Sequence, residues 1–183
     1  GLLGLRPVPL VGREPERRRL WDALYDVSAG RGPRGLLLRG AAGIGKRRLA
    51  TWLGEEAHER GMATVLRATH APLGGAADGL VPMLARHLGC ANLDAVGAGR
   101  RLAQLFDLDD VDPDQSAEVT GLGELLVRDH LAGPERRALA RGAVRRLAVE
   151  RPLVLIVEDA QWGADALAIV AELLDSDLPI LVV

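Results

Sequence analysis

The sequence predicts an α/β fold with a mainly parallel sheet between two layers of helices. Apolar segments of strand length alternate along the chain with longer segments of helical periodicity, which is typical of parallel strands joined by crossover helices. A glycine-rich segment, residues 40–45, separates the first predicted strand from a helix. With 183 residues, 48% of them hydrophobic, the chain has the size and apolar content of one domain.

The first third of the chain predicts two helices and two strands in alternation. Leu20, Leu24 and Val27 recur at helical spacing until glycines end the pattern. A compact apolar run follows, then the glycine-rich loop, and Gly61 is placed to close the next helix. The expected elements are a helix at 14–25, a strand at 35–39, a helix at 46–60 and a strand at 63–69.

The remainder predicts a mostly helical stretch followed by a return to the sheet. Pro134 suits the first turn of a helix, and residues 153–157 form the clearest strand of the chain. Residues 107–118 are rich in aspartate and predict an acidic loop. The expected helices are 80–88, 93–108, 121–131, 134–150 and 164–174, and the expected strands are 153–157 and 180–183.

Composition excludes several classes of protein. The net charge of −2 and a pI near 6.1 give no overall attraction to nucleic acid or to an anionic membrane, and no apolar run approaches the length of a membrane span. A single cysteine, Cys90, and no leader-like segment indicate the cytoplasm. We expect one domain over residues 1–183, a piece of a larger protein truncated at its C-terminal end, with a helical insertion at about 78–133.

The glycine-rich loop matches seven positions of the phosphate-binding pattern GxxxxGK[ST]. Glycines let backbone N–H groups converge on phosphate oxygens, the following helix adds its dipole, and Lys46 supplies a charge for the terminal phosphates. Lys46 is the only lysine beside 22 arginines, which favours this reading over a plain glycine-rich turn. The predicted phosphate-binding residues are Gly40, Ala41, Ala42, Gly43, Ile44, Gly45, Lys46 and Arg47.

Two carboxylates follow the buried strand at 153–157. Glu158 and Asp159 occupy the position from which one carboxylate orients a Mg²⁺ shell and the other polarises water in ATP hydrolysis. They are the candidate catalytic residues, and the candidate metal ligands if a metal binds. A purely structural role for an acidic strand end is the alternative.

Together these motifs resemble the signal-transducing STAND-type AAA ATPases, which include the ATPase domains of large LuxR-type regulators. The resemblance rests on residues 10–14, LVGRE, on the phosphate loop, and on residues 157–162, VEDAQW, and it covers most of the chain. It implies a three-layer P-loop NTPase fold with sheet order 5-1-4-3-2 and ATP or ADP as ligand. It places Val11, Gly12 and Arg13 near the adenine, and implies a switch controlling effector domains of the same chain in signal transduction or transcription regulation.

The chain departs from that family at two positions. The residue after Lys46 should be serine or threonine, whose hydroxyl binds Mg²⁺, but it is Arg47, which cannot ligate a metal. The acidic residue expected two positions after Trp162 is Ala164, and Asp165 comes one position late. We expect nucleotide binding with impaired hydrolysis, and Arg47 pairing with a phosphate or with Glu158 and Asp159; alternatively Arg47 points to solvent and water completes the metal shell.

The other functional readings stay open at this stage. A competent Mg²⁺-dependent ATPase and a nucleotide-free interaction scaffold are the main alternatives, and self-association is possible. The aspartates of 107–114 do not fit an EF-hand, and the arginines of 136–146 read as a solvated helix face, so calcium binding, direct nucleic-acid binding and membrane contact are not expected.

Overall fold

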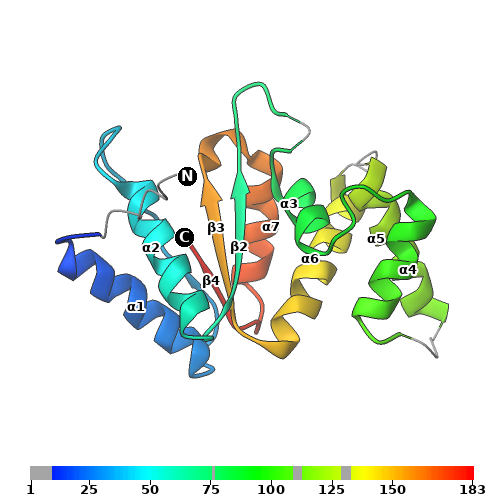
Figure 1. Ribbon diagram of the computed structural model, residues 1–183, viewed down its shortest axis with the longest axis horizontal. Helices are drawn as coiled ribbons and strands as arrows, with labels where there is room; N and C mark the ends of the chain where they lie inside the picture. The colour runs from blue at the N-terminus through cyan, green and yellow to red at the C-terminus, as the bar shows by residue number, and fades with distance from the viewer. Residues whose placement is uncertain (1–9, 76, 109–112, 129–132) are drawn as a thin grey trace, which may run out of the picture.

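The computed structural model describes residues 10–75, 77–108, 113–128 and 133–183, except for the side chains of 113–116. Strands and helices alternate as the sequence predicts (Figure 1). The strands are β1 (Arg34–Gly35), β2 (Thr64–Thr69), β3 (Leu153–Glu158) and β4 (Ile180–Val182). The helices are α1 (Glu14–Ser28), α2 (Lys46–Glu59), α3 (Leu80–His87), α4 (Ala95–Leu105), α5 (Pro113–Arg128), α6 (Gly133–Glu150), the 3₁₀ turn η1 (Ala160–Trp162) and α7 (Ala164–Leu174).

The described strands form one parallel sheet in the order β1-β4-β3-β2. This is the order that the resemblance implies for its strands 1-4-3-2. In the register of β2 and β3, Thr69 lies opposite Glu158, so both strands end at the same edge of the sheet. That edge also carries the loop that precedes α2 (Figure 1). The fold therefore brings the glycine-rich loop and the acidic strand end to one side of the molecule.

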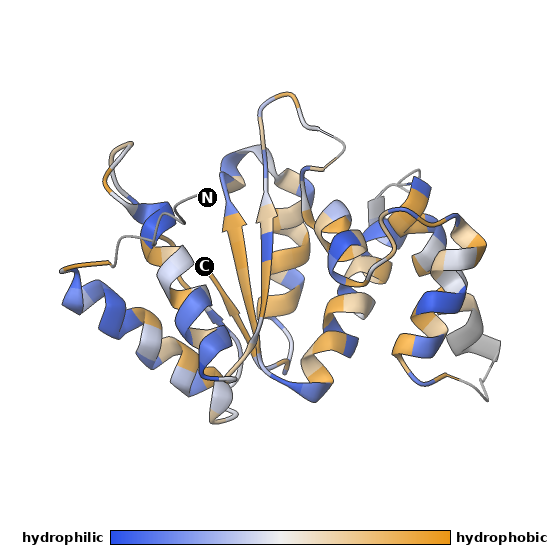
Figure 2. Ribbon diagram, in the orientation of Figure 1, coloured by the Kyte–Doolittle hydropathy of each residue, from blue (hydrophilic) through white to orange (hydrophobic). Residues whose placement is uncertain are grey.

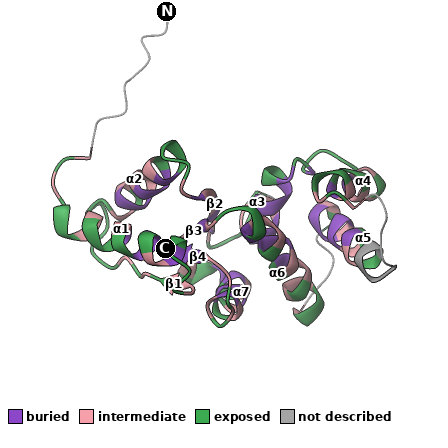
Figure 3. Ribbon diagram, turned by 90° about the horizontal axis from the view of Figure 1, so that it is seen from below, coloured by how far each residue is buried: buried purple, intermediate pink, exposed green. Residues whose placement is uncertain are grey.

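Two apolar cores cover the two faces of the sheet. Alternate residues of a strand point to opposite faces, and in β3 Val154 and Ile156 join the core with α1 and α2, while Leu153 and Leu155 join the core with α3 to α7. Figures 1 and 3 show α1 and α2 on one side of the sheet and the remaining helices on the other. Figure 2 shows β3 as mainly hydrophobic, as expected of a strand whose two faces are both covered by helices.

Close packing of α2 on the sheet depends on Gly54. A methyl group at this position would lie 3.1 Å from Cγ1 of Val65 and 3.3 Å from Cδ1 of Ile156. The absence of a side chain lets α2 approach β2 and β3 closely.

Two sequence predictions differ from the structure. The first strand was expected over 35–39, but β1 covers only Arg34–Gly35. Beyond it the N–H of Leu36 donates to the carbonyl of Val182 at 2.8 Å, and the chain then continues into the loop that precedes α2. The acidic loop expected over 107–118 is helical from Pro113, where α5 begins eight residues earlier than predicted; proline and acidic residues favour a first helical turn. Residues 109–112 of that loop lie outside the described residues.

Candidate nucleotide site

The loop between β1 and α2 has the geometry of a phosphate cradle. Gly43 and Gly45 adopt φ values of 77° and 97°, which glycine tolerates far better than other residues. Gly45 is the N-cap of α2 and has no side chain to cap it, so the N–H groups of the first turn of α2 remain available to an anion. The loop residues 40–45 are all exposed.

Lys46 lies at the first position of α2 and curls back over the loop. Its Nζ donates to the carbonyl of Gly40 at 2.8 Å and to that of Ala41 at 3.0 Å. These bonds place the ammonium group inside the ring of backbone that the loop forms. A phosphate entering this ring would meet the ammonium and the helix N-terminus together.

Glu158 and Asp159 end β3 in two different environments. The side chain of Glu158 is only 11% exposed, whereas that of Asp159 is 49% exposed. Asp159 has φ 54° and ψ 41°, a left-handed conformation that turns the chain from β3 into η1. The two carboxylates therefore point from one strand end toward the start of α2.

Arg47 contacts both carboxylates. Its Nε lies 3.2 Å from Oε2 of Glu158, and its Nη2 lies 3.3 Å from Oδ2 of Asp159. The sequence left three possibilities for Arg47: pairing with a phosphate, pairing with Glu158 and Asp159, or pointing to solvent. The structure shows the pairing with the two acids. One planar guanidinium thus bridges the phosphate loop helix and the acidic end of β3.

A second arginine, which the sequence analysis did not single out, approaches Glu158 from β2. Nη1 of Arg67 lies 3.4 Å from Oε1 of Glu158 and donates to Oγ1 of Thr51 at 2.9 Å. Glu158 is consequently paired on both of its oxygens. The only sequence signal for Arg67 is a charged residue inside an otherwise apolar strand; its partner could be found only once β2 and β3 were placed side by side.

The segment at 11–13 lies against the loop. Nη2 of Arg13 donates to the carbonyl of Ile44 at 2.8 Å, and its Nη1 pairs with Glu16 at 3.1 Å. A backbone hydrogen bond, followed by that from Arg13, lowers the pKa of the Glu16 carboxyl. Gly12 has φ 76° and Val11 is 84% exposed. Arg13 thus links this segment to the phosphate loop, and the place of residues 11–13 near the adenine stays a prediction.

These elements surround a pocket of about 590 Å³, within the usual range for small-ligand sites. Leu10, Leu36, Leu38 and Leu49 supply apolar walls. Its lining carries more positive than negative charge. The charged lining residues are Arg13, Arg19, Arg39, Lys46 and Arg48 against Glu16.

The residues present fit a nucleotide but not the family's usual Mg²⁺ site. The cradle, Lys46 and the partly apolar pocket suit phosphates with an attached base. Where a metal-binding hydroxyl would stand, however, the Arg47 guanidinium holds the two carboxylates that would face a metal. Within the described part of the chain, moreover, no group of three or more His, Cys, Asp or Glu side chains is arranged to hold a metal.

His70, which follows β2, and the residues that follow β3 form a group apart from the phosphate loop. The buried His70 does not line the 590 Å³ pocket. Its Nδ1 lies 3.1 Å from the carbonyl oxygen of Glu158, and its ring packs on Gly163. Trp162 is exposed. Oδ2 of Asp165, the acidic residue that comes one position late, pairs with Nε of Arg136 on α6 at 2.8 Å and does not face the phosphate loop.

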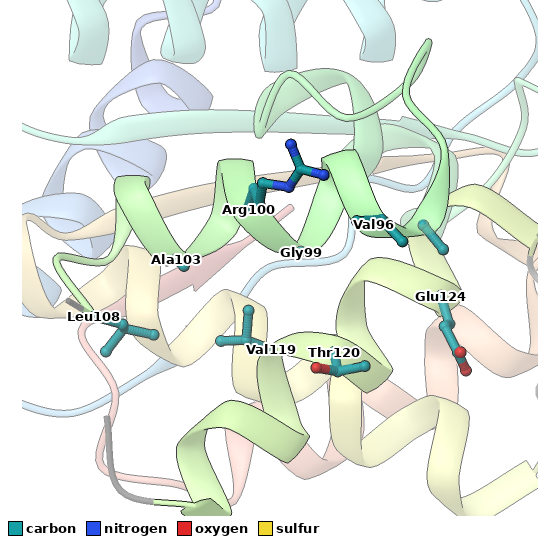
Figure 4. Close-up of a pocket in the computed structure, with 9 residues that line it drawn as sticks. Val96, Gly99, Arg100, Ala103, Leu108, Val119, Thr120 and Glu124 are labelled. Carbon is teal, nitrogen blue, oxygen red and sulfur yellow. The ribbon is translucent and has the colours of Figure 1, made fainter. Parts of the chain in front are cut away.

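A second cavity, of about 410 Å³, lies between α4 and α5 (Figure 4). Val96 and Ala103 of α4 and Val119 of α5 give it mainly apolar walls, with Arg100 and Glu124 at its edge. None of the residues predicted to bind nucleotide lines it. It therefore lies in the helical region, apart from the phosphate loop.

The fold and the loop define a P-loop NTPase: a parallel sheet with order 1-4-3-2, a glycine-rich loop before a helix, and a lysine at the helix start. A family model described as an AAA ATPase domain matches residues 9–183. The chain belongs to this family, whose members bind nucleotide. A comparison with curated proteins finds no significant match. Among the described helices, none is long and apolar enough to cross a membrane.

Proposed function

We propose that this chain is an ATP- or ADP-binding regulatory switch module with weak hydrolysis, part of a cytoplasmic signalling or transcription-regulating protein. The observation that carries the proposal is the contact of Arg47 with both Glu158 and Asp159. It leaves the phosphate cradle available while occupying the two acids that hydrolysis needs. The STAND-type motifs described above support the regulatory role.

Binding would use groups that the loop already presents. The N–H groups at the start of α2 and the ammonium of Lys46 would hold the phosphates, and the apolar wall beside Val11 and Leu36 would receive the base. Glu158 and Asp159 keep their assignment as candidate catalytic residues, but each is engaged by an arginine. A carboxylate whose oxygens are held by a guanidinium is less available to position a metal ion or a water molecule.

The contact of Arg13 with the loop offers a route from nucleotide to the rest of the protein. Because Arg13 bonds the Ile44 carbonyl, a phosphate that reshapes the loop would also move the start of α1. A nucleotide controls such a switch only by binding its two conformations with different affinity. Effector domains of the same chain, or a second copy, would respond to this movement.

Calorimetry with Lys46→Ala tests the proposal. The intact chain should bind ATP and ADP, and the variant should lose at least about 2 kcal/mol of binding free energy, because a charged hydrogen-bond partner of the phosphates is gone. Arg145→Ala is the matched control, since it removes one positive charge from an exposed site on α6. Equal affinity of the intact chain and Lys46→Ala would contradict a phosphate site at Lys46, and no binding by the intact chain would favour a scaffold.

A further inference from the structure

We infer that this site selects the metal-free nucleoside polyphosphate over its Mg²⁺ complex, with Arg47 acting as a permanent cation in the place of the metal. The inference rests on the proposed function, because it names the charge state of the nucleotide that the same site takes. Its starting point is the four-residue cluster Arg47, Arg67, Glu158 and Asp159.

The cluster is balanced in charge without any added ion. Two guanidinium groups face two carboxylates, and the distances are 3.2 Å, 3.3 Å and 3.4 Å. Glu158 is the more buried acid, so leaving it unpaired would carry a substantial cost. A divalent cation arriving next to this cluster would meet two positive groups and no uncommitted carboxylate.

The neighbouring pocket has the opposite character. Five of its lining side chains are basic and one is acidic. Lys46 is aimed into the phosphate loop, and Arg48 follows on the same helix. Free ATP carries about two more negative charges than its Mg²⁺ complex, so it gains more from such a surface.

The two observations act in the same direction. The cationic pocket favours the more negative ligand, and the arginine-neutralised cluster withholds the oxygen ligands that Mg²⁺ prefers. Selectivity is then a difference of affinities that contains both an attractive and a repulsive part. Binding of Mg²⁺ to the nucleotide and binding of the nucleotide to the protein oppose each other.

Calorimetric titration of the whole chain with ATP and with ADP, in excess Mg²⁺ and in EDTA at equal ionic strength, tests the inference. The dissociation constant should be at least about fivefold lower in EDTA, the lower end of usual couplings between two ligands. Arg47→Ser removes the guanidinium, frees Asp159, leaves Glu158 paired only with Arg67 and adds the missing hydroxyl, and should reverse the preference. Arg47→Lys keeps the charge and should keep the preference for free nucleotide.

Two controls make the outcomes separable. Arg145→Ser repeats the substitution far from the site and should leave the Mg²⁺ preference unchanged, and thermal unfolding of each variant shows that it is folded. Tighter binding with Mg²⁺ in the intact chain would overturn the inference and leave nucleotide binding standing. A preference for free nucleotide that survives Arg47→Ser would overturn the role of Arg47. No binding in either condition would overturn the proposed function, and the inference with it.

Discussion

At the scale of single residues, one substitution within a standard motif changes what the site can do. The phosphate loop needs backbone N–H groups and one cation, and both are present in residues 40–46. The next position normally supplies a hydroxyl, and Arg47 instead supplies a fork of N–H donors that spans Glu158 and Asp159. Under the proposed function, binding and turnover would therefore depend on different residues of the same loop and helix.

Turnover should respond to Arg47 in the direction opposite to that of a usual active-site substitution. Arg47→Ser is expected to raise the Mg²⁺-dependent rate of phosphate release by about tenfold or more, because it restores a metal-binding hydroxyl, frees Asp159 and leaves Glu158 paired only with Arg67. Release of inorganic phosphate under single-turnover conditions measures the rate. The double variant Arg47→Ser with Glu158→Gln should return to the basal rate. An unchanged rate in Arg47→Ser would show that Arg47 does not limit hydrolysis.

At the scale of elements, the turn from β3 into α7 is fixed by a contact between glycine and histidine. The backbone N–H of His70 donates to the carbonyl of Glu158, and Nδ1 of its ring lies 3.1 Å from the same oxygen. A methyl group on Gly163 would lie 2.5 Å from Cδ2 and 2.6 Å from Nε2 of that ring. The end of β2, the end of β3 and the start of α7 are thus locked together beside the acidic pair.

Gly163→Ala should destabilise the fold by about 1–3 kcal/mol, the usual cost of overpacking. The same change in a His70→Ala background should cost much less, because the smaller side chain makes room for the new methyl group. Denaturant unfolding of the four proteins of this double-mutant cycle gives the coupling energy. If the losses of unfolding free energy in the two single variants simply add in the double variant, the His70 ring is not what excludes a methyl group at position 163.

At the scale of the whole molecule, the nucleotide site and the α4–α5 pair lie at opposite ends of the structure (Figure 1). The pair packs closely through Gly123: a methyl group there would lie 3.0 Å from the backbone N of Gly99 and 3.1 Å from the carbonyl of Ala95. A methyl group on Gly99 would meet no atom within 4 Å, since this residue faces the cavity of Figure 4. Two neighbouring glycines on facing helices therefore differ in what they tolerate.

Gly123→Ala should lower stability by about 1–3 kcal/mol, because backbone atoms cannot move aside as a flexible side chain can. Gly99→Ala is the matched control and should be neutral or stabilising by up to about 1 kcal/mol through its better helix propensity. Thermal unfolding measures both. In each variant the free energy of ATP binding should stay within about 0.5 kcal/mol of that of the intact chain, as for distant independent sites. A larger change would show that the helical region and the nucleotide site are coupled.

The sequence by itself determined the alternation of strands and helices, the phosphate loop and the acidic strand end, because these are local patterns of periodicity, glycine and charge. The helix predicted at 164–174 has the same bounds as α7. The start of α5 was missed, because an aspartate-rich stretch resembles a loop and a helix start equally well.

Only the tertiary structure decided which charged side chains of the site pair with each other. Arg47 and Asp159 are 112 residues apart, and Arg67 and Glu158 are 91 apart. Their pairing depends on the register of β2 against β3 and on the close approach of α2 at Gly54. A sequence motif names the groups of a site, but the charge balance among them is set by packing between elements that are remote in the chain. In this protein, that packing brings Arg47 into contact with both Glu158 and Asp159.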